Sequence, residues 1–185
     1  MEPVVRVGVT VTFLRMFTPP EEAAPPLAEG ATVVRLAAPT GAFYRYLYDT
    51  VGGPYVWWLR RAVSLTELAA IIRHPDVSIH VLYMGGEPAG FFELDARPAP
   101  DINLSYFGLM PHAVGHRLGH AFLRAAVYEA WRAEPRMLTV NTCTADHPRA
   151  LPLYRRVGFR PFRQIAELWE VPVRLGMTIP PALRA

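Results

Sequence analysis

The sequence predicts a mixed α/β domain built on a mostly antiparallel sheet, and three patterns support that prediction. Residues 5–13 alternate between apolar and polar or small side chains, the two-residue period of a strand with one buried face. Strand-like runs follow at 77–84, 89–95 and 102–109, joined by turns too short for anything but antiparallel hairpins. Residues 116–133 place apolar and small side chains on one broad face of a helix, which would pack closely on that sheet, and polar side chains that include Arg124 on the other face.

The length and composition indicate one ordinary domain, expected to span residues 1–185 with an irregular tail at 173–185. Hydrophobic residues make up 51% of the chain and no apolar run reaches the roughly 20 residues that span a bilayer, which excludes a disordered or membrane-spanning chain. The first residues carry Glu2 and Arg6 and lack a small-residue cleavage site, so they make a poor signal peptide. With Cys143 as the lone cysteine, these features predict a cytoplasmic protein.

The charge pattern argues against two classes of partner and against a metal site. The net charge of +3 permits contact with anions, but the arginines are scattered and no base-stacking or zinc-finger signature is present, so we expect neither nucleic acid nor membrane as a partner. His112, His116 and His120 would form a metal-binding edge only on one continuous helix, which Pro111 prevents. We therefore expect no metal.

The remaining elements before residue 77 are predicted from local signals. Residues 17–32 hold four prolines and predict a loop that leads to a short strand at 33–37. Residues 41–53 predict an aromatic-rich helix closed by a glycine pair, and residues 54–61 predict a loop crowded with aromatic side chains. Ser64 and Glu67 form a capping box, which starts the next helix.

After the long helix, a strand at 136–142, a helix at 147–159 and a last strand within 160–171 are expected, with Asp146 as the helix N-cap. The tail at 173–185 has two prolines, with a third directly before it at Pro172, and no period. Packing of this tail on a neighbouring copy would give a homodimer, and the sequence leaves the oligomeric state open.

The junction between the expected strand at 102–109 and the long helix at 116–133 has the features of an anion site. A strand ends at Leu109, the chain turns, and a helix begins near Gly115 with free NH groups at the positive end of its dipole. Gly115 and Gly119 have no side chain to block a phosphate on the NH groups of residues 115–119. The alternative is that these glycines serve only tight packing, which is common at helix starts.

Two segments and the order of the elements resemble the GNAT superfamily of N-acetyltransferases. The segments are "YFGLMPHAVGHRLG" (106–119) and "DHPRALPLYRRVGF" (146–159), and the antiparallel runs lie directly before the first. The resemblance implies a GNAT-like twisted sheet with helices on both faces. It also implies that acetyl-coenzyme A binds in a splay between the strand ending at Leu109 and the strand near 137–142.

By the same resemblance, six consecutive residues hold the pyrophosphate: Val114, Gly115, His116, Arg117, Leu118 and Gly119. Val114 stands where the family has Arg or Gln, a position that acts mainly through its backbone, and Arg117 replaces a glycine. Arg117 either pairs with phosphate or obstructs it. We favour a phosphate-facing or outward-swung Arg117, because a helical start needs no positive φ.

The chemistry that the resemblance implies is direct attack of an amine on the thioester, without an acyl-enzyme or a metal. The backbone NH of Leu109 would polarise the carbonyl, and Tyr154, a phenol of pKa ~10, would protonate a leaving thiolate of pKa ~8.5. From the residues alone, Tyr154 could equally be a core aromatic. The family's glutamate base matches Asn103 here, which cannot take up a proton and is expected to contact the substrate. Glu93 is the substitute base, either lining a cleft or lying solvated on its strand.

The acceptor is predicted to be a primary amine of a small molecule or peptide. Aromatic side chains crowd the region that builds the acceptor site in this family, and they predict a flat pocket unless they only fill the core. They are Tyr44, Tyr46, Tyr48, Tyr55, Trp57 and Trp58, with Trp58 the candidate substrate contact. The alternative function is a non-catalytic GNAT-like module that binds acyl-coenzyme A or a partner.

Overall fold

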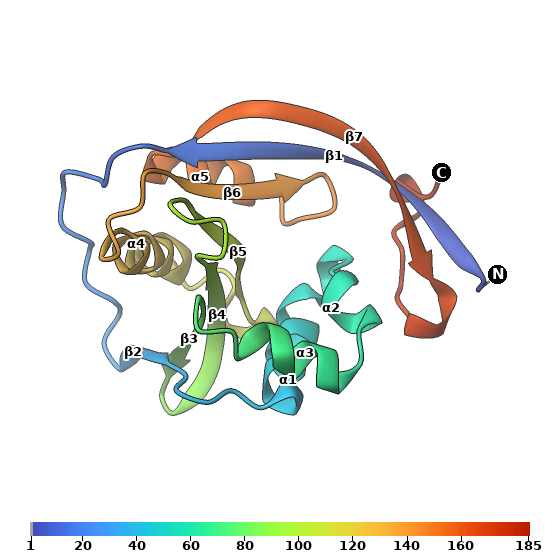
Figure 1. Cartoon of the computed structure of the whole chain (residues 1–185), viewed down its shortest axis with the longest axis horizontal. Coiled ribbons are helices and arrows are strands. Elements are labelled where there is room, and N and C mark those ends of the chain that lie inside the picture. Colours follow the sequence, from blue (N-terminus) through green and yellow to red (C-terminus); the bar gives the residue numbers. More distant parts are fainter. Residues whose placement is uncertain (1) are drawn as a thin grey trace.

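The computed structural model describes residues 2–185 and contains one seven-stranded sheet with helices on both faces (Figure 1). The strand order is β2-β3-β4-β5-β6-β1-β7, and neighbours run antiparallel except the parallel pair β5 and β6. The strands are β1 (Val4–Met16), β2 (Ala31–Arg35), β3 (Val77–Met84), β4 (Glu87–Asp95), β5 (Ile102–Leu109), β6 (Leu138–Cys143) and β7 (Arg160–Pro172). The helices are α1 (Gly41–Gly52), α2 (Leu59–Ala62), α3 (Leu65–Ile72), α4 (Leu118–Trp131) and α5 (Ala150–Val157). The predicted fold class is confirmed.

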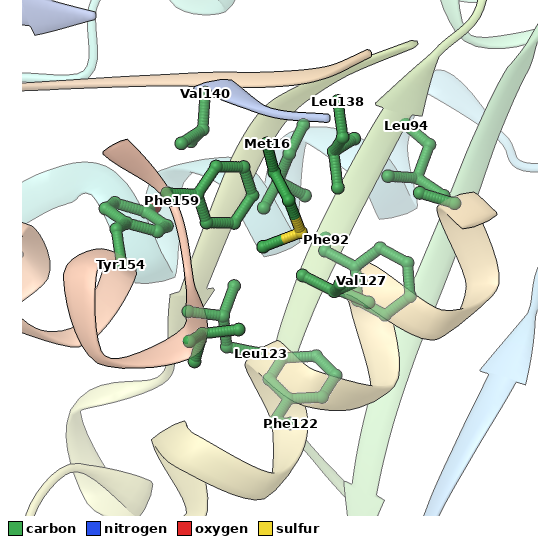
Figure 2. Close-up of a cluster of buried hydrophobic side chains, with 14 of the residues drawn as sticks. Met16, Phe92, Leu94, Phe122, Leu123, Val127, Leu138, Val140, Tyr154 and Phe159 are labelled. Atoms are coloured by element: carbon green, nitrogen blue, oxygen red, sulfur yellow. The ribbon is translucent and has the colours of Figure 1, made fainter. Parts of the chain in front are cut away.

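Hydrophobic burial fixes the helices on both faces of the sheet. On one face, α4 and α5 cover the largest buried cluster, which includes Phe92, Phe122, Leu123 and Phe159 (Figure 2). On the opposite face, α1 and α3 pack over β3 and β4 through a second cluster that includes Leu47 and other buried residues. The capping box at Ser64 and Glu67, predicted from sequence, is present at the start of α3.

β1, the first strand of the chain, lies inside the sheet between β6 and β7. β1 pairs with β7 along nearly its whole length but with β6 only from Val11 onward, so its first half extends beyond β6. The tail fills the edge that β6 leaves free: Arg184 bridges to Val7, and the NH of Ala185 donates to the carbonyl of Arg6 (3.1 Å). A third cluster, which includes Val7 and Ile179, forms beneath the tail. The tail therefore packs on its own β1.

Two sequence predictions about the long helix need correction. α4 begins at Leu118 rather than His116, because a 3-10 turn (Pro111–Ala113) and a left-handed residue precede it. Arg124, expected on the exposed polar face, is only 6% exposed. Its guanidinium donates to the carbonyls of Glu22 and Ala23, so it anchors the proline-rich loop against α4.

Two predictions about shorter helices also need correction. Residues 54–61, expected to form a loop, contain a 3-10 turn (Gly53–Tyr55) and the start of α2. Asp146 does not cap the next helix, because α5 starts at Ala150 with Arg149 as its N-cap. Across the residues that the structure describes, no helix is both long and apolar enough to cross a membrane.

The packing of the tail on β1 predicts that the tail unfolds together with the sheet. Ile179 is 3% exposed in the third cluster, so Ile179→Ala should lower the free energy of unfolding by ~2–4 kcal/mol. Urea denaturation measures this, with the exposed neighbour Thr178→Ala as the matched control. An unchanged midpoint for Ile179→Ala would show that the tail is detached in solution.

Candidate functional site

The parallel strands β5 and β6 pair only over Ile102–Leu104 and Leu138–Val140, and they separate beyond those residues. The NH of Met110 donates to the carbonyl of Ala89 on β4 (2.9 Å). Because successive residues of a strand direct their hydrogen-bonding groups to opposite edges, the NH of Leu109 points away from β4, toward the opening. This opening is the β5–β6 splay, where the resemblance to the GNAT superfamily implies that the thioester binds.

Asp146 braces the far side of the splay. One carboxylate oxygen accepts from the Thr142 hydroxyl (2.8 Å) and from the backbone NH of Cys143 (2.9 Å). The other accepts from the indole NH of Trp57 (3.1 Å), a residue between α1 and α2 that is 89 residues distant in the chain. These bonds explain why Asp146 is not a helix cap: its carboxylate ties the end of β6 to the helices of the opposite side.

Two glycines let this brace lie close to the sheet. A Cβ at Gly52 would come within 2.4 Å of the Trp57 Cβ, and one at Gly108 within 2.3 Å of the Val51 Cγ1. Such distances are too short for any side chain, so Trp57 and Val51 occupy space that only glycine leaves free.

Tyr154 projects from α5 toward the splay. Its side chain is 6% exposed, and its ring packs edge-on against Phe107 of β5 and Phe159 (centroids 6.3 and 5.9 Å apart). Burial, together with the charge of Asp146, raises the pKa of the Tyr154 phenol well above its usual value. The hydroxyl makes no hydrogen bond within the described residues, so it is a protonated donor with no partner.

The turn before α4 differs from the expected helical start. Gly115 has φ 91° and Arg117 has φ 60°, so both lie in the left-handed region. A helical start was expected to need no positive φ, and that expectation is wrong, because Arg117 is the left-handed N-cap residue that precedes Leu118. A non-glycine residue there costs ~1–2 kcal/mol. At Gly119 a Cβ would meet ordinary contacts (3.6 Å to Leu153), so tight packing does not require that glycine.

A pocket of about 220 Å³ lies between this turn, the end of β5 and the Gly53–Tyr55 turn. The ring of Tyr55 meets the ring of His147 edge-on (centroids 5.9 Å apart) at this pocket. The pocket brings together Leu109 and Val114, two of the predicted cofactor contacts. Its lining residues are Val51, Pro54, Tyr55, Leu109, Pro111, Val114 and His147.

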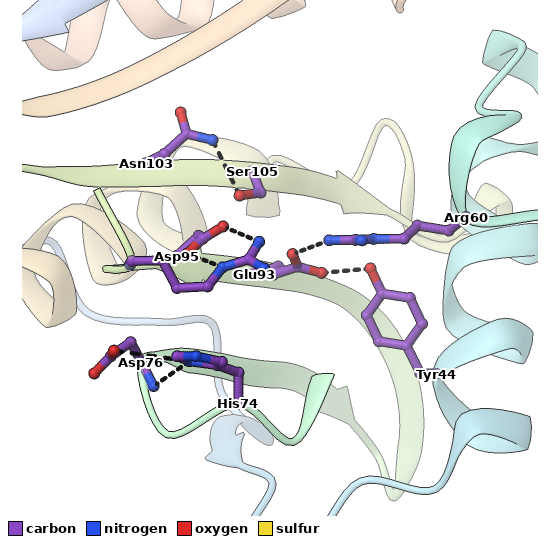
Figure 3. A network of polar contacts seen from close by, with 9 residues as sticks. Tyr44, Arg60, His74, Asp76, Glu93, Asp95, Asn103 and Ser105 are labelled. Carbon is purple, nitrogen blue, oxygen red and sulfur yellow. Dashed lines mark hydrogen bonds and ion pairs between the residues drawn. The ribbon is translucent and has the colours of Figure 1, made fainter. Parts of the chain in front are cut away.

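Glu93 is buried in an ion pair rather than lining a cleft or lying solvated (Figure 3). Its side chain is fully buried, and its carboxylate accepts from the Arg60 guanidinium (2.7 Å) and from the Tyr44 hydroxyl. Burial and the neighbouring carboxylate raise the pKa of Tyr44 well above its usual value, so its phenol stays a donor. No local sequence signal reveals Arg60, because its partner lies 33 residues away.

The crowded aromatic residues are mostly core. Tyr44 and Tyr48 are buried in the second cluster, and Trp57 packs between Tyr48 and Tyr106. Trp58 packs against the third cluster. The predicted flat pocket is therefore not formed by Tyr44 and Tyr48, and the alternative of core packing is the correct one for them.

Asn103 lies in a different pocket of about 310 Å³. Its amide donates to the Ser105 hydroxyl and accepts from the Thr139 hydroxyl (3.0 Å each), so its orientation is fixed (Figure 3 shows the first bond). The pocket combines the amide and hydroxyl groups of Asn103, Thr139 and Asn141 with the rings of Phe13 and Phe162. Its lining residues are Phe13, Leu14, Asp95, Pro98, Asn103, Thr139, Val140, Asn141 and Phe162.

The described residues favour neither a metal site nor a nucleophilic cysteine. Within residues 2–185, no three His, Cys, Asp or Glu side chains come together as a metal-binding group. Burial and the Asp146 charge raise the pKa of the Cys143 thiol to about 12, so it is a poor nucleophile at neutral pH.

Solved structures share this fold at low identity. A GCN5-related N-acetyltransferase from Sphaerobacter thermophilus is 17% identical, with a TM-score of 0.64 over 92% of this chain and 53% of that chain. A tandem GNAT protein from the clavulanic acid biosynthesis pathway is 16% identical, with a TM-score of 0.58 over 91% and 55%. An aminoglycoside acetyltransferase from an uncultured soil metagenomic sample, in complex with trehalose, is 11% identical, with a TM-score of 0.61 over 77% and 96%. The chain thus spans little more than half the length of the first two.

No curated protein matches the chain. A family model described as the acetyltransferase (GNAT) family matches residues 43–159, which include α1, the antiparallel strands, the splay and α5. Because this match covers more than half of the sequence, the chain belongs to the GNAT family of acetyltransferases.

Proposed function

We propose that the protein transfers the acetyl group of acetyl-coenzyme A to a primary amine of a small molecule or peptide, by direct attack within a ternary complex. One observation carries this proposal: the NH of Leu109 points into the β5–β6 splay, and the Tyr154 hydroxyl, which has no hydrogen-bond partner among the described residues, lies near enough to Asp146 at the end of β6 for that carboxylate to raise its pKa. Acyl transfer from a thioester needs a donor to the carbonyl oxygen and a donor to the departing sulfur.

The residues of the chain divide this work. Acetyl-coenzyme A supplies the acetyl group as an activated thioester. The NH of Leu109 donates to the oxygen that gains negative charge, and the rigid strand holds it in place without reorganisation. Because burial and Asp146 raise its pKa, Tyr154 holds its proton throughout the neutral range and donates a hydrogen bond to the charge that develops on sulfur; the same shift disfavours complete proton transfer to a thiolate of pKa ~8.5.

The turn from Val114 to Gly119 is the proposed phosphate site. Free NH groups of His116, Arg117 and Leu118 at the start of a 14-residue helix favour an anion, and Gly115 leaves the approach open, since nothing lies within 4 Å of its missing Cβ. The pocket shared by Leu109 and Val114 leads from this turn to the splay. Its size and mainly apolar lining suit the pantetheine chain.

The proposed acceptor surface runs along β5 from the Asn103 pocket, where β5 and β6 are still paired, to Leu109 about 20 Å away, so the amine of the acceptor must reach across that distance to the splay. Its pocket has amide and hydroxyl groups and exposed phenyl surface, which suits a neutral polar body bearing the amine. An aminoglycoside acetyltransferase among the similar structures supports an amine as the acceptor group. The proposal places Trp58 outside this surface, because Trp58 packs against the third cluster.

The direct test is turnover. Purified protein with acetyl-coenzyme A and a panel of primary amines, including amino sugars, amino acids and peptide N-termini, should release free thiol, which a thiol reagent measures. Binding of acetyl-coenzyme A without release of thiol above the hydrolysis background for any amine would favour the non-catalytic acyl-coenzyme A module instead.

Tyr154→Phe should lower kcat by roughly ten- to a hundred-fold and leave the affinity for acetyl-coenzyme A unchanged. Because the pKa of Tyr154 is raised, the factor should stay constant from about pH 6 to pH 9. Steady-state kinetics across this range measure it, with Tyr83→Phe as the control. An unaltered kcat would remove Tyr154 from the reaction.

Glu93→Gln should act on stability, because it leaves the buried Arg60 guanidinium without a counter-charge. We expect the free energy of unfolding to fall by roughly 3 kcal/mol. The control is Glu170→Gln, which breaks an exposed pair with Arg6 (3.8 Å) and should change little. Full stability with lost activity would instead assign Glu93 as the base.

Arg117→Gly and Arg117→Asn separate charge from strain at the phosphate turn. Glycine relieves the positive φ and should raise the free energy of unfolding by ~1 kcal/mol, whereas asparagine tolerates that φ and only removes the charge. Both variants should weaken acetyl-coenzyme A binding, by roughly ten-fold, if the guanidinium pairs with phosphate. Tighter binding by either variant, in calorimetric titration, would show that Arg117 obstructs the site.

A further inference from the structure

β7 forms the outer edge of the sheet over 13 residues. It pairs with β1 on one side, and no strand of the described chain pairs with its other side (Figure 1). The tail does not cover this edge, because Arg184 and Ala185 bond to β1 instead. A long free edge presents unpaired NH and carbonyl groups that can accept another strand.

The side chains of β7 are complementary to themselves about Ile165. Arg163 and Glu167 lie two residues on either side of Ile165, and all three share one face of the strand, opposite Phe13, Val11 and Val9 of β1. If two β7 strands pair antiparallel about a two-fold axis at Ile165, Arg163 lies opposite Glu167 of the second copy. The axis repeats this contact, so each pairing makes two ion pairs.

Neighbouring registers lose this complementarity. With the axis at residue 167, Glu167 would face its own copy, and like charges directly opposite are destabilising. With the axis at residue 164, 166 or 168, Arg163 would face an apolar residue of the second copy, which is Ile165, Trp169 or Val173 respectively. The charge pattern therefore selects the register centred on Ile165.

The local geometry permits the pairing over a short length. The register between β1 and β7 shifts beside Phe13, which ends the regular stretch of β7 at Arg163. One oxygen of Glu167 accepts from the indole NH of Trp169 (2.8 Å), and the other stays available for an arginine.

We propose that two copies of this chain dimerise by antiparallel pairing of their β7 strands, centred on Ile165, so that the two sheets become continuous. The contact goes beyond the proposed acetyl transfer. β6 and β1 separate it from β5 and the splay, so the dimer leaves the splay open, whereas Phe162, next to Arg163 on β7, lines the proposed acceptor pocket. A pairing of about five residues buries a small area, which predicts a weak dimer with Kd in the micromolar range.

Sedimentation velocity over a range of protein concentrations tests the charge pairing. The unmodified protein should dimerise, and Arg163→Glu and Glu167→Arg should each be monomeric, because each places like charges opposite one another. An equal mixture of the two variants should form a mixed dimer, since Glu167 and the new acid of one copy then face two cations of the other. The double variant Arg163→Glu, Glu167→Arg should again dimerise with itself, because opposite charges then face each other. A monomeric unmodified protein at every concentration, or no recovery in the mixture, would overturn the proposal.

Disulfide trapping tests the register. Ile165→Cys on the axis would face its own copy at a Cα separation of ~4.5–5.5 Å, within disulfide range. Leu168→Cys is the control: it is exposed on the same strand, but the register separates its two copies by ~20 Å. Under mild oxidation, Ile165→Cys should form a covalent dimer rapidly and Leu168→Cys should not. The unmodified protein measures any cross-linking that comes from Cys143. Equal rates for both variants would refute the register. The affinity of Arg163→Glu for acetyl-coenzyme A at the splay should be unchanged, which keeps failure of the dimer distinct from failure of the proposed function.

Discussion

The loss of hydrogen bonding between β5 and β6 after Leu104 and Val140 is the constraint on which the site depends. Parallel strands that stayed paired would consume the Leu109 NH and close the space that Tyr154 faces. The separation leaves backbone groups without partners, a cost that a fold tolerates only where a ligand or water meets them. The Asp146 brace keeps the opening defined, because it holds the end of β6 and the Trp57 indole with one carboxylate.

The opposite side of the sheet is built for rigidity. Tyr44 and Tyr48 pack as core, and the buried Glu93 holds Arg60 between α2 and β4. This network ties α1 and α2 to β4, the strand next to β5 in the sheet. Because Tyr44 and Tyr48 fill the core, the proposed acceptor surface includes the pocket around Asn103 instead of these tyrosines.

Local patterns predicted most of the fold, and the resemblance to the GNAT superfamily gave the position of the splay. The alternation in β1, the three antiparallel strands and the capping box at Ser64 each depend on residues close together in sequence, and the structure confirms them. Contacts between distant segments were beyond such patterns. The sequence around Arg124 suggests a surface residue, but the loop at Glu22 covers it in the structure. The sequence around Glu93 suggests a free base, but Arg60 of α2 forms an ion pair with it. The left-handed φ of Arg117 was missed because the helix start was placed two residues too early.

The measurement that tests the central claim most directly is a thermal melt of the purified protein with saturating acetyl-coenzyme A, desulfo-coenzyme A or ATP. A ligand that binds only the folded state raises its stability by RT ln(1 + [L]/Kd). If the turn at Gly115 and the β5–β6 splay form one site, both coenzyme A compounds raise the Tm and ATP does not. No shift with any of the three would contradict the account.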